Sequence, residues 1–356
     1  MKSKTKKIII FSIVGASVLY LGGGFVAAPI VNSMIFGKRL SDDSFYSQST
    51  ASIFKLRRDF PLLGNRKTYT FESGDNRLSG YYYEVSSPKG LVIACHGLRS
   101  FADWVDAEYQ NRFVENGYSV FAIDTTASGQ SEGSGIRGLY QSAYDVKNAY
   151  DFIKKERFCK DNVILIGHSM GGFGVAASIG LGVKADRLIT LAAFDNPFNE
   201  MLALSKSAVG VLTDITFPTF AISEITLQGG DIFMSASKAI NESKTKSLII
   251  QGDKDKTVPL NDGSLYQKLD ESDYVQKLLI EGADHSGIYR SKEANSYYND
   301  EIKPKVRELE KANKKEELKE FLSTVDKEKT SELSKDVFDA IEAFLKWKLS
   351  SIIYLP

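Results

Sequence analysis

The sequence has few of the side chains that hold disulfide-rich or zinc-dependent proteins together. Only two cysteines and three histidines occur among 356 residues. A disulfide framework and a thiolate zinc cluster are therefore excluded, because each needs more of these side chains. Stability must come from an apolar core, and a hydrophobic content of 43% is typical of folded globular proteins.

The chain also lacks a net charge. Its 45 basic and 45 acidic side chains cancel, so no overall positive field attracts nucleic acid, and we expect no nucleic-acid partner. The charges are unevenly placed, however. Residues 1–40 hold six basic side chains and no acidic one, which leaves a net −6 on residues 41–356.

A long uncharged segment follows the first four lysines. Residues 8–31 are mostly Ile, Val, Leu, Phe, Ala and Gly, and roughly 20 such residues cross the hydrocarbon core of a bilayer. A buried core helix would have a polar face, and this segment has none. We predict an uncleaved transmembrane anchor, with the basic residues 1–7 in the cytoplasm and the rest of the chain outside. The alternative is a cleaved signal and a secreted protein, although Pro29 follows the best cleavage site, Val26-Ala27-Ala28.

Beyond a stalk predicted for residues 41–66, strand and helix patterns alternate. A hairpin is predicted within residues 69–85, and apolar runs follow at 91–95, 119–123, 163–166, 188–191 and 248–250. Helical patterns lie between them, at 103–116, 140–158 and 172–181. Apolar runs of this kind are typical of central parallel strands. We therefore predict an α/β fold with a mostly parallel sheet and helices on both faces.

A serine follows one of these predicted strands. Ligands of such sheets bind beyond the carboxyl ends of the strands, and Gly167-His168-Ser169-Met170-Gly171 stands there, between the run at 163–166 and a helical pattern. Glycines allow the tight turn that a nucleophilic serine needs, and the helix amino end offers free N–H groups to an oxyanion. The alternative is a glycine-rich turn with an incidental serine.

A serine hydroxyl becomes a useful nucleophile only beside a base. The candidates are His96, His168 and His285. His285 lies on a loop after the strand-like run at 275–280, and it fits the chain order of serine, acid and histidine. We predict His285 as the base. His168 adjoins the serine on a turn that should direct it elsewhere, so we expect a structural role for it.

Three aspartates between the serine and His285 could supply the acid. Asp253 and Asp255 follow the run at 248–250 on one loop, and Asp195 follows the run at 188–191. We favour Asp255 and keep the other two as alternatives.

Four segments, in this order, resemble the α/β-hydrolase superfamily: His96-Gly97, residues 167–172, residues 252–259 and Asp284-His285. The resemblance covers about residues 67–290 and a final helix. In that family the aspartate before Val-Pro at this spacing is the acid, which supports Asp255. Residues 124–133 are similar to the monoacylglycerol lipase-like and serine aminopeptidase-like members, but they lack the usual Arg-Gly-His.

The resemblance implies acyl transfer without a cofactor or metal. His285 would deprotonate Ser169, Asp255 would orient the imidazole, and the backbone N–H groups of Leu98 and Met170 would form the oxyanion hole. We expect a membrane-anchored serine hydrolase that cleaves carboxylic esters, with a small-molecule or lipid ester as substrate. The alternatives are a serine peptidase on the same fold and a non-catalytic binding protein.

Two segments lengthen the hydrolase domain, which we predict at residues 67–350. Residues 195–245 are predicted as a cap, whose apolar residues either line an acyl pocket or only pack the cap onto the domain. Residues 291–336, half of them charged, precede a closing helix at 337–345. Their apolar spacing predicts two amphipathic helices, which form either a solvated hairpin or a lid or docking surface near the site.

Overall fold

The computed structural model describes residues 36–37, 39, 45–104, 106–158, 161–209, 212–260 and 263–347. The anchor predicted at residues 8–31 lies outside the described residues. Within the described ranges, no helix is both long enough and apolar enough to cross a membrane.

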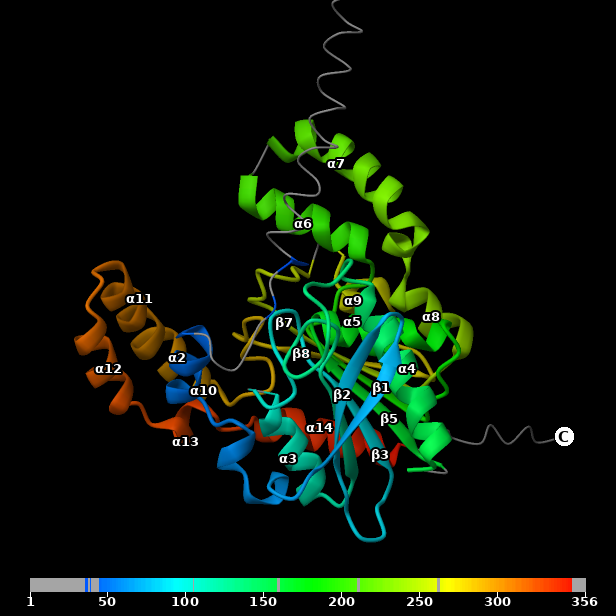
Figure 1. Cartoon of the computed structure of the whole chain (residues 1–356), viewed down its shortest axis with the longest axis horizontal. Coiled ribbons are helices and arrows are strands. Elements are labelled where there is room, and N and C mark those ends of the chain that lie inside the picture. The colour runs from blue at the N-terminus through cyan, green and yellow to red at the C-terminus, as the bar shows by residue number, and fades with distance from the viewer. Residues whose placement is uncertain are drawn as a thin grey trace, which may run out of the picture.

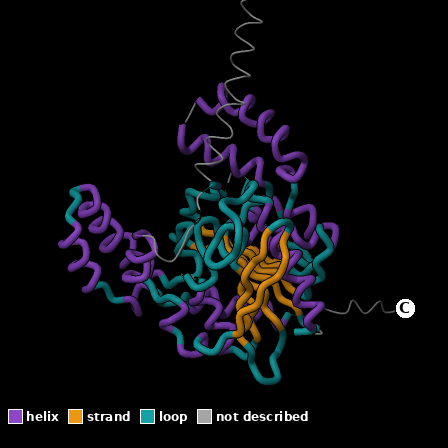
Figure 2. Tube along the Cα trace, in the orientation of Figure 1, coloured by secondary structure: helices purple, strands orange, loops and turns teal. Residues whose placement is uncertain are grey.

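An eight-stranded sheet forms the centre of the molecule (Figures 1 and 2). Its strand order is β1-β2-β4-β3-β5-β6-β7-β8. Strand β2 is antiparallel to β1 and β4, and the strands from β4 to β8 run parallel. The mostly parallel sheet that the sequence predicts is therefore confirmed. The strands are β1 (Lys67–Ser73), β2 (Asn76–Tyr83), β3 (Leu91–Cys95), β4 (Ser119–Ile123), β5 (Val163–His168), β6 (Arg187–Leu191), β7 (Ser247–Gly252) and β8 (Val275–Ile280).

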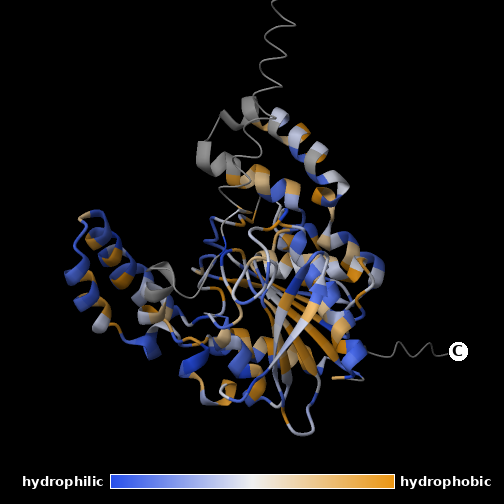
Figure 3. Ribbon diagram, in the orientation of Figure 1, coloured by the Kyte–Doolittle hydropathy of each residue, from blue (hydrophilic) through white to orange (hydrophobic). Residues whose placement is uncertain are grey.

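Helices cover both faces of the sheet. Every residue of β3, β4 and β7 is buried, as expected of strands that are covered on two sides. One face packs against α4 (Gln141–Glu156), α5 (Met170–Gly180) and α8 (Ala236–Ser243), and the other against α3 (Ala107–Glu115) and α14 (Lys335–Lys346). Figure 3 shows the strands as an apolar block inside a more polar outer layer.

The segment predicted as a cap contains three α-helices. Helices α6 (Pro197–Val209) and α7 (Leu212–Gln228), followed by the 3₁₀ turn η3 (Gly229–Phe233), form a unit set off from the sheet (Figure 1). The ring of Phe198 lies 5.2 Å from that of Phe217 and 5.1 Å from that of Phe233, which holds this unit together. Helix α8 differs from the predicted cap, because Ala239 and Ile240 enter the core of the sheet domain beside α5.

The charged segment after β8 forms a helical arm, which we define as residues 292–330. It extends to the side of the sheet in Figure 1. The arm consists of α10 (Lys292–Ser296), a π-helical turn η4 (Tyr297–Ile302), α11 (Lys303–Lys311), α12 (Lys315–Ser323) and α13 (Lys327–Thr330). Leu309 of α11 and Leu318 of α12 are buried, so the two amphipathic helices expected there pack against their neighbours.

Helix α2 (Phe45–Ile53) packs on the arm, so the segment predicted as a stalk at residues 41–66 is largely folded onto the domain. Ile53 and the following Phe54 form a buried cluster with Ile302 of the arm. The hydroxyl of Thr330 donates a hydrogen bond to the carbonyl of Ile53. The stalk expectation followed from the polar start of this segment, and the arm that covers its apolar residues comes more than two hundred residues later in the chain.

Two 3₁₀ turns, η1 (Arg57–Asp59) and η2 (Pro61–Leu63), carry the chain from α2 to β1. Lys327 of the arm pairs with Asp59 at 2.8 Å. Leu63 is fully buried in the core beneath α3. The short helix α9 (Leu265–Lys268) lies between β7 and β8 in the chain.

Replacing Phe54 by alanine should lower the free energy of unfolding by about 3–5 kcal/mol, the usual cost of deleting a buried aromatic ring. Phe54 is 6% exposed, and its ring centre lies 4.9 Å from that of Tyr298 and 4.1 Å from the guanidinium carbon of Arg290. Urea unfolding followed by circular dichroism measures the loss. As a control, Leu62→Ala removes a side chain from a residue that is 52% exposed and should cost less than about 0.5 kcal/mol. Equal costs for the two variants would contradict the packing of α2 on the arm.

Candidate active site

Ser169 occupies a strained turn between β5 and α5. Its backbone angles, φ 55° and ψ −120°, lie outside the regions that residues with side chains normally adopt. Two glycines make the turn possible. A Cβ atom added to Gly167 would lie 2.3 Å from the carbonyl oxygen of Gly171, and one added to Gly171 would lie 2.1 Å from that of Cys95. The start of α5 therefore packs directly on the end of β3 and leaves Ser169 at the edge of the sheet.

His285 lies between Ser169 and Asp255. Its Nε2 atom is 2.9 Å from the Oγ of Ser169, and its Nδ1 atom is 2.8 Å from the Oδ2 of Asp255. Because a carboxylate accepts at Nδ1, that nitrogen carries the proton and Nε2 is available to accept the proton of the serine. The structure thus brings together the three predicted residues, which come from the loops after β5, β7 and β8.

Hydrogen bonds hold Asp255 in place for this contact. Its Oδ1 atom accepts from the backbone N–H groups of Thr257, at 2.8 Å, and Val258, at 2.9 Å. The side-chain amide of Gln251 donates to its Oδ2 atom at 3.0 Å. Asp255 is only 6% exposed, and these donors replace the water that a buried carboxylate loses.

The two alternative acids have other partners. Asp253 accepts a hydrogen bond from the backbone N–H of Gly282 at 2.7 Å. Asp195 accepts from the N–H of Ser237 at 2.7 Å and the hydroxyl of Ser235 at 3.1 Å. Asp253 therefore stabilises a loop, and Asp195 fixes the start of α8.

His168 touches the triad although the sequence predicts only a structural role for it. Its Nε2 atom is 2.8 Å from the carbonyl oxygen of His285, and the two rings lie 4.9 Å apart. Burial lowers the pKa of His168 to about 3, so the ring is neutral near pH 7 and donates from Nε2. His168 thereby positions the backbone of His285 and does not compete for the serine proton.

His96 ties together two loops beside the nucleophile. Its Nδ1 donates to the carbonyl of Gly97 at 2.7 Å, and its Nε2 accepts from the backbone N–H of Thr125 at 3.1 Å and lies 2.9 Å from the hydroxyl of Ser128. Burial lowers the pKa of His96 to about 4. A neutral, fully occupied imidazole is a structural group, and its bonds hold the turn that leads to Leu98.

Leu98 and Met170, the predicted oxyanion donors, both border a small cavity beside His96. An added Cβ on Gly97 would lie 3.3 Å from the Cβ of Ser169, so the loop that carries Leu98 runs directly past the nucleophile. Met170 is the first residue of α5, where a backbone N–H has no acceptor within its own helix. Both predicted donors thus belong to segments that adjoin Ser169, and the oxyanion hole stays a prediction.

Asp124, at the end of β4, fixes the loop after Leu98. Its carboxylate accepts from the N–H groups of Ala102 and Gln130, both at 2.8 Å, and from the hydroxyl of Tyr81 at 2.7 Å. Burial raises its pKa to about 6 although these donors oppose the shift. Asp124 thereby links the loop after Leu98, through Ala102, to the loop after β4 and to β2.

A cavity of about 460 Å³ opens beside the triad, and both Ser169 and His285 line it. The loop at residues 97–100 forms one side. Helix α2 and the arm form the other, through the apolar side chains of Ile53, Phe54 and Val306. The charged segment therefore contributes one wall of this cavity, and the expected lid or docking surface stays a prediction.

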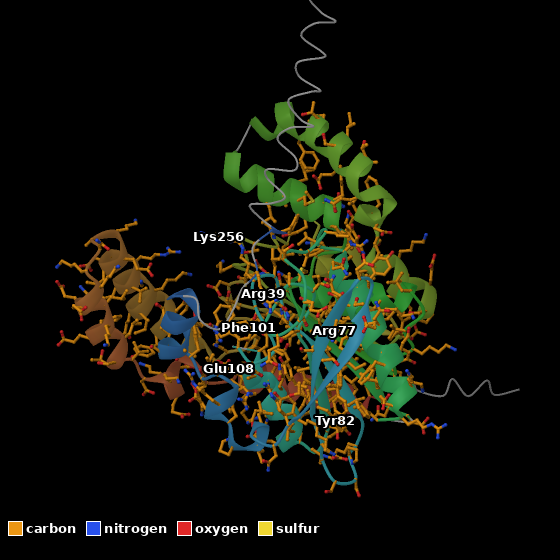
Figure 4. The ribbon with its side chains drawn as sticks, viewed as in Figure 1. Arg39, Arg77, Tyr82, Phe101, Glu108 and Lys256 are labelled. Atoms are coloured by element: carbon orange, nitrogen blue, oxygen red, sulfur yellow. The ribbon has the colours of Figure 1, made fainter. Side chains whose placement is uncertain are left out.

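A buried ion pair stands behind this wall. Arg290 donates to both carboxylate oxygens of Glu108, at 3.1 and 3.2 Å, and the two side chains are 3% and 0% exposed. Glu108 lies between the sheet and the arm in Figure 4. Arg290 also stacks on Phe54 and follows His285 by five residues. The pair therefore joins α3, the His285 loop and α2.

No group of His, Cys, Asp and Glu side chains within the described ranges is arranged to bind a metal ion.

Comparison with known proteins gives matches to parts of the chain. The family model described as serine aminopeptidase, S33, matches residues 86–227. The quorum-quenching protein AidA of Acinetobacter baumannii is 25% identical over 142 residues, which cover 38% of this chain and 46% of that protein. The chain thus matches about half the length of this relative.

Solved structures share the architecture. An esterase of Pyrococcus furiosus, Pf2001, has a TM-score of 0.50 at 18% identity, over 70% of this chain and 93% of the esterase. The chain has the α/β-hydrolase fold. An acylaminoacyl peptidase of Pyrococcus horikoshii also has a TM-score of 0.50, at 17% identity, over 63% of this chain and 38% of the peptidase. The family match and the geometry around Ser169 agree on a serine hydrolase with this fold.

One buried acid of this hydrolase fold has no sequence signal. Glu200 on α6 is 4% exposed, and its Oε2 atom has no hydrogen-bond partner. Burial, with a smaller contribution from Asp255, raises its pKa from 4.5 to about 8. The folded state thus binds the proton of Glu200 more tightly than the unfolded state, and unfolding releases that proton at neutral pH.

The contribution of Glu200 to stability should therefore be fully present below about pH 4.5 and decline as the pH rises toward about 8. Replacing Glu200 by glutamine removes this titration. Thermal unfolding between pH 5 and 8 should give Glu200→Gln a flatter profile than the wild type and a higher melting temperature at pH 8. The exposed Glu242→Gln serves as a control and should follow the wild-type profile. Parallel profiles for wild type and Glu200→Gln would contradict the raised pKa.

Proposed function

We propose that the protein is a serine esterase that cleaves carboxylic esters through an acyl-enzyme intermediate. The observation that carries the proposal is the hydrogen-bonded series from the Oγ of Ser169 through His285 to Asp255, with distances of 2.9 and 2.8 Å. Ser169 lies on a strained turn at the carboxyl ends of the parallel strands, where it borders the cavity. Its base is already within hydrogen-bond distance.

The reaction begins when His285 takes the proton of Ser169 while Oγ attacks the ester carbonyl. The carbonyl oxygen becomes an oxyanion that accepts from the backbone N–H groups of Leu98 and Met170, and one such donor contributes about 2.7–4 kcal/mol to the transition state. The imidazolium then gives its proton to the leaving alcohol. Water then attacks the acyl carbonyl and loses a proton to His285, which returns that proton to the Oγ of Ser169 as the acid leaves.

Esters are the preferred substrate class for two reasons. The Pyrococcus furiosus protein that shares the fold is an esterase. The cavity beside Ser169 has an apolar side formed by Ile53, Phe54 and Val306, which suits the hydrocarbon part of a small-molecule or lipid ester. A serine peptidase is the second candidate, favoured by the description of the matching family and by the acylaminoacyl peptidase of the same fold.

Purified protein should hydrolyse short 4-nitrophenyl esters faster than aminoacyl 4-nitroanilides, and a fluorophosphonate probe should label it. Ser169→Ala should lose the labelling and at least about a thousandfold of the esterase kcat, because the residual rate comes from binding and the oxyanion hole alone. Faster turnover of the anilides would favour the peptidase. An unlabelled wild-type protein would contradict both enzymatic functions and leave a non-catalytic binding protein.

We also propose that residues 8–31 anchor the enzyme in a membrane, with the amino terminus in the cytoplasm and the catalytic domain outside. The support is the uncharged span and the lysines before it. The chain reaches the domain soon afterwards: Phe36 is 4% exposed, and its carbonyl accepts from the N–H of Ile136 at 3.0 Å. Five residues extend at most about 18 Å, so this arrangement keeps the domain close to the bilayer surface.

The full chain should remain in the membrane pellet after alkaline carbonate extraction, since a spanning helix inserts stably whereas surface contacts are removed. A variant that lacks residues 1–31 should move to the supernatant and keep its fluorophosphonate labelling. If the released protein has a lower mass, as expected for a chain cut near residue 28, the segment is instead a cleaved signal. Release at full length would contradict both the anchor and the signal.

A further inference from the structure

We propose that Ser100 and Asp106 form a polar subsite inside the catalytic cavity and bind a hydroxyl group of the ester substrate. The inference rests on the proposed esterase function and narrows its substrate class. Both residues line the cavity that contains Ser169 and His285, so a molecule held at the serine reaches them.

Asp106 stands where an aspartate usually caps a helix, but it does not cap this one. It precedes α3 at the N-cap position, and its side chain makes no capping hydrogen bond. It is 1% exposed, and its Oδ2 atom has no hydrogen-bond partner. A buried polar atom without a partner costs about 1–3 kcal/mol, so a ligand group or an ordered water that pairs with it is favoured. Asp106 therefore has an acceptor that the described fold does not use.

Ser100 supplies a second unused group in the same cavity. It is 9% exposed, and its Oγ atom has no hydrogen-bond partner. It follows the oxyanion residue Leu98 by two positions, after Arg99, whose φ of 57° turns the loop. Asp124 pins this loop through Ala102, so the hydroxyl of Ser100 is held on a rigid support.

The nearby charges do not explain Asp106. Arg290, the cation that acts on its pKa, already donates to both oxygens of Glu108. Glu108 is a second acid close by, and together with burial it raises the pKa of Asp106 to about 7. Asp106 forms no ion pair and lies near Glu108, so its charged form lowers the free energy of unfolding. Its oxygen is consequently available to a ligand.

A hydroxyl fits this pair better than the other possible groups. It can donate to the Oδ2 of Asp106 and at the same time accept from the Oγ of Ser100, which satisfies both unpaired atoms. A substrate ammonium can only donate, and of the other charged side chains that line the cavity, Arg99, Lys303 and Arg307 outnumber Glu310. A hydrocarbon chain would leave both atoms unpaired. Sites built for a hydroxyl discriminate strongly against analogues that lack it.

The test compares matched esters with and without a hydroxyl. On the acyl side the probes are 4-nitrophenyl hexanoate, its 3-hydroxy and 6-hydroxy derivatives and its 6-ammonio derivative. On the alcohol side they are propyl hexanoate and 3-hydroxypropyl hexanoate, followed by pH-stat. In at least one arm the hydroxylated ester should have a kcat/KM at least about tenfold higher than its parent, the value of one good hydrogen bond to a carboxylate.

Ser100→Ala and Asp106→Asn should each reduce that ratio, and the double variant should bring it to within about threefold of one. Glu115→Gln removes a carboxylate from the other end of α3, outside this cavity, and should keep the wild-type ratio. Fluorophosphonate labelling of each variant verifies that the nucleophile is intact. Asp106→Asn preserves the volume of the side chain, so the test does not depend on a variant that leaves a cavity.

Three results would overturn the subsite: ratios near one in both arms, as a bound water alone would give; a preference for the ammonium ester; or ratios that the two variants leave unchanged. In each case a labelled, ester-hydrolysing wild type would leave the esterase function intact. A wild-type protein that resists the fluorophosphonate probe would instead refute the esterase function itself, so the two failures are distinguishable.

Discussion

The candidate active site depends on the close approach of the end of β3 to the start of α5. No room exists for a Cβ atom at Gly167 or Gly171, and this contact forces Ser169 into its strained turn at the tip of β5. The same approach brings the loop after Gly97 against the nucleophile. Ser169 and the segments that carry the predicted oxyanion donors are thus positioned by backbone packing, and side chains such as His96 and Asp124 hydrogen-bond the neighbouring loops.

A second set of contacts surrounds this centre and is made of side chains. The buried pair of Arg290 and Glu108 connects the loop of His285 to α3, and the ring of Phe54 covers the guanidinium. Breaking a buried pair leaves an uncompensated charge, which is far more costly than the pair is stabilising. Removing either Arg290 or Glu108 alone would therefore be strongly destabilising. Through this pair and the ring of Phe54, the wall of the cavity is connected to the loop that carries His285.

The sheet and the triad could be predicted because their signals are local. Apolar runs bounded by turn residues mark the strands, and the chain order of Ser169, Asp255 and His285 is the order that the resemblance to α/β-hydrolases implies. The contact of His168 with the carbonyl of His285 could not be predicted, because it depends on how two distant loops meet. Helix α2 could not be placed either: its partner is the arm, and an amphipathic segment alone does not identify what covers it. The unpaired atoms of Ser100 and Asp106 carry no pattern at all.

The pairing of α2 with the arm also sets an order of events during synthesis. Phe54 and Thr330 are 276 positions apart in the chain, and translation at about 5–20 residues per second separates their emergence by roughly 14–55 s. Arg290, Tyr298 and Ile302, the other partners of Ile53 and Phe54, emerge only shortly before Thr330, so until then this wall of the cavity is incomplete. The cavity beside Ser169 is consequently complete only after residues 290–330 have been made, so a shorter product that contains Ser169 and Asp255 still lacks one of its walls.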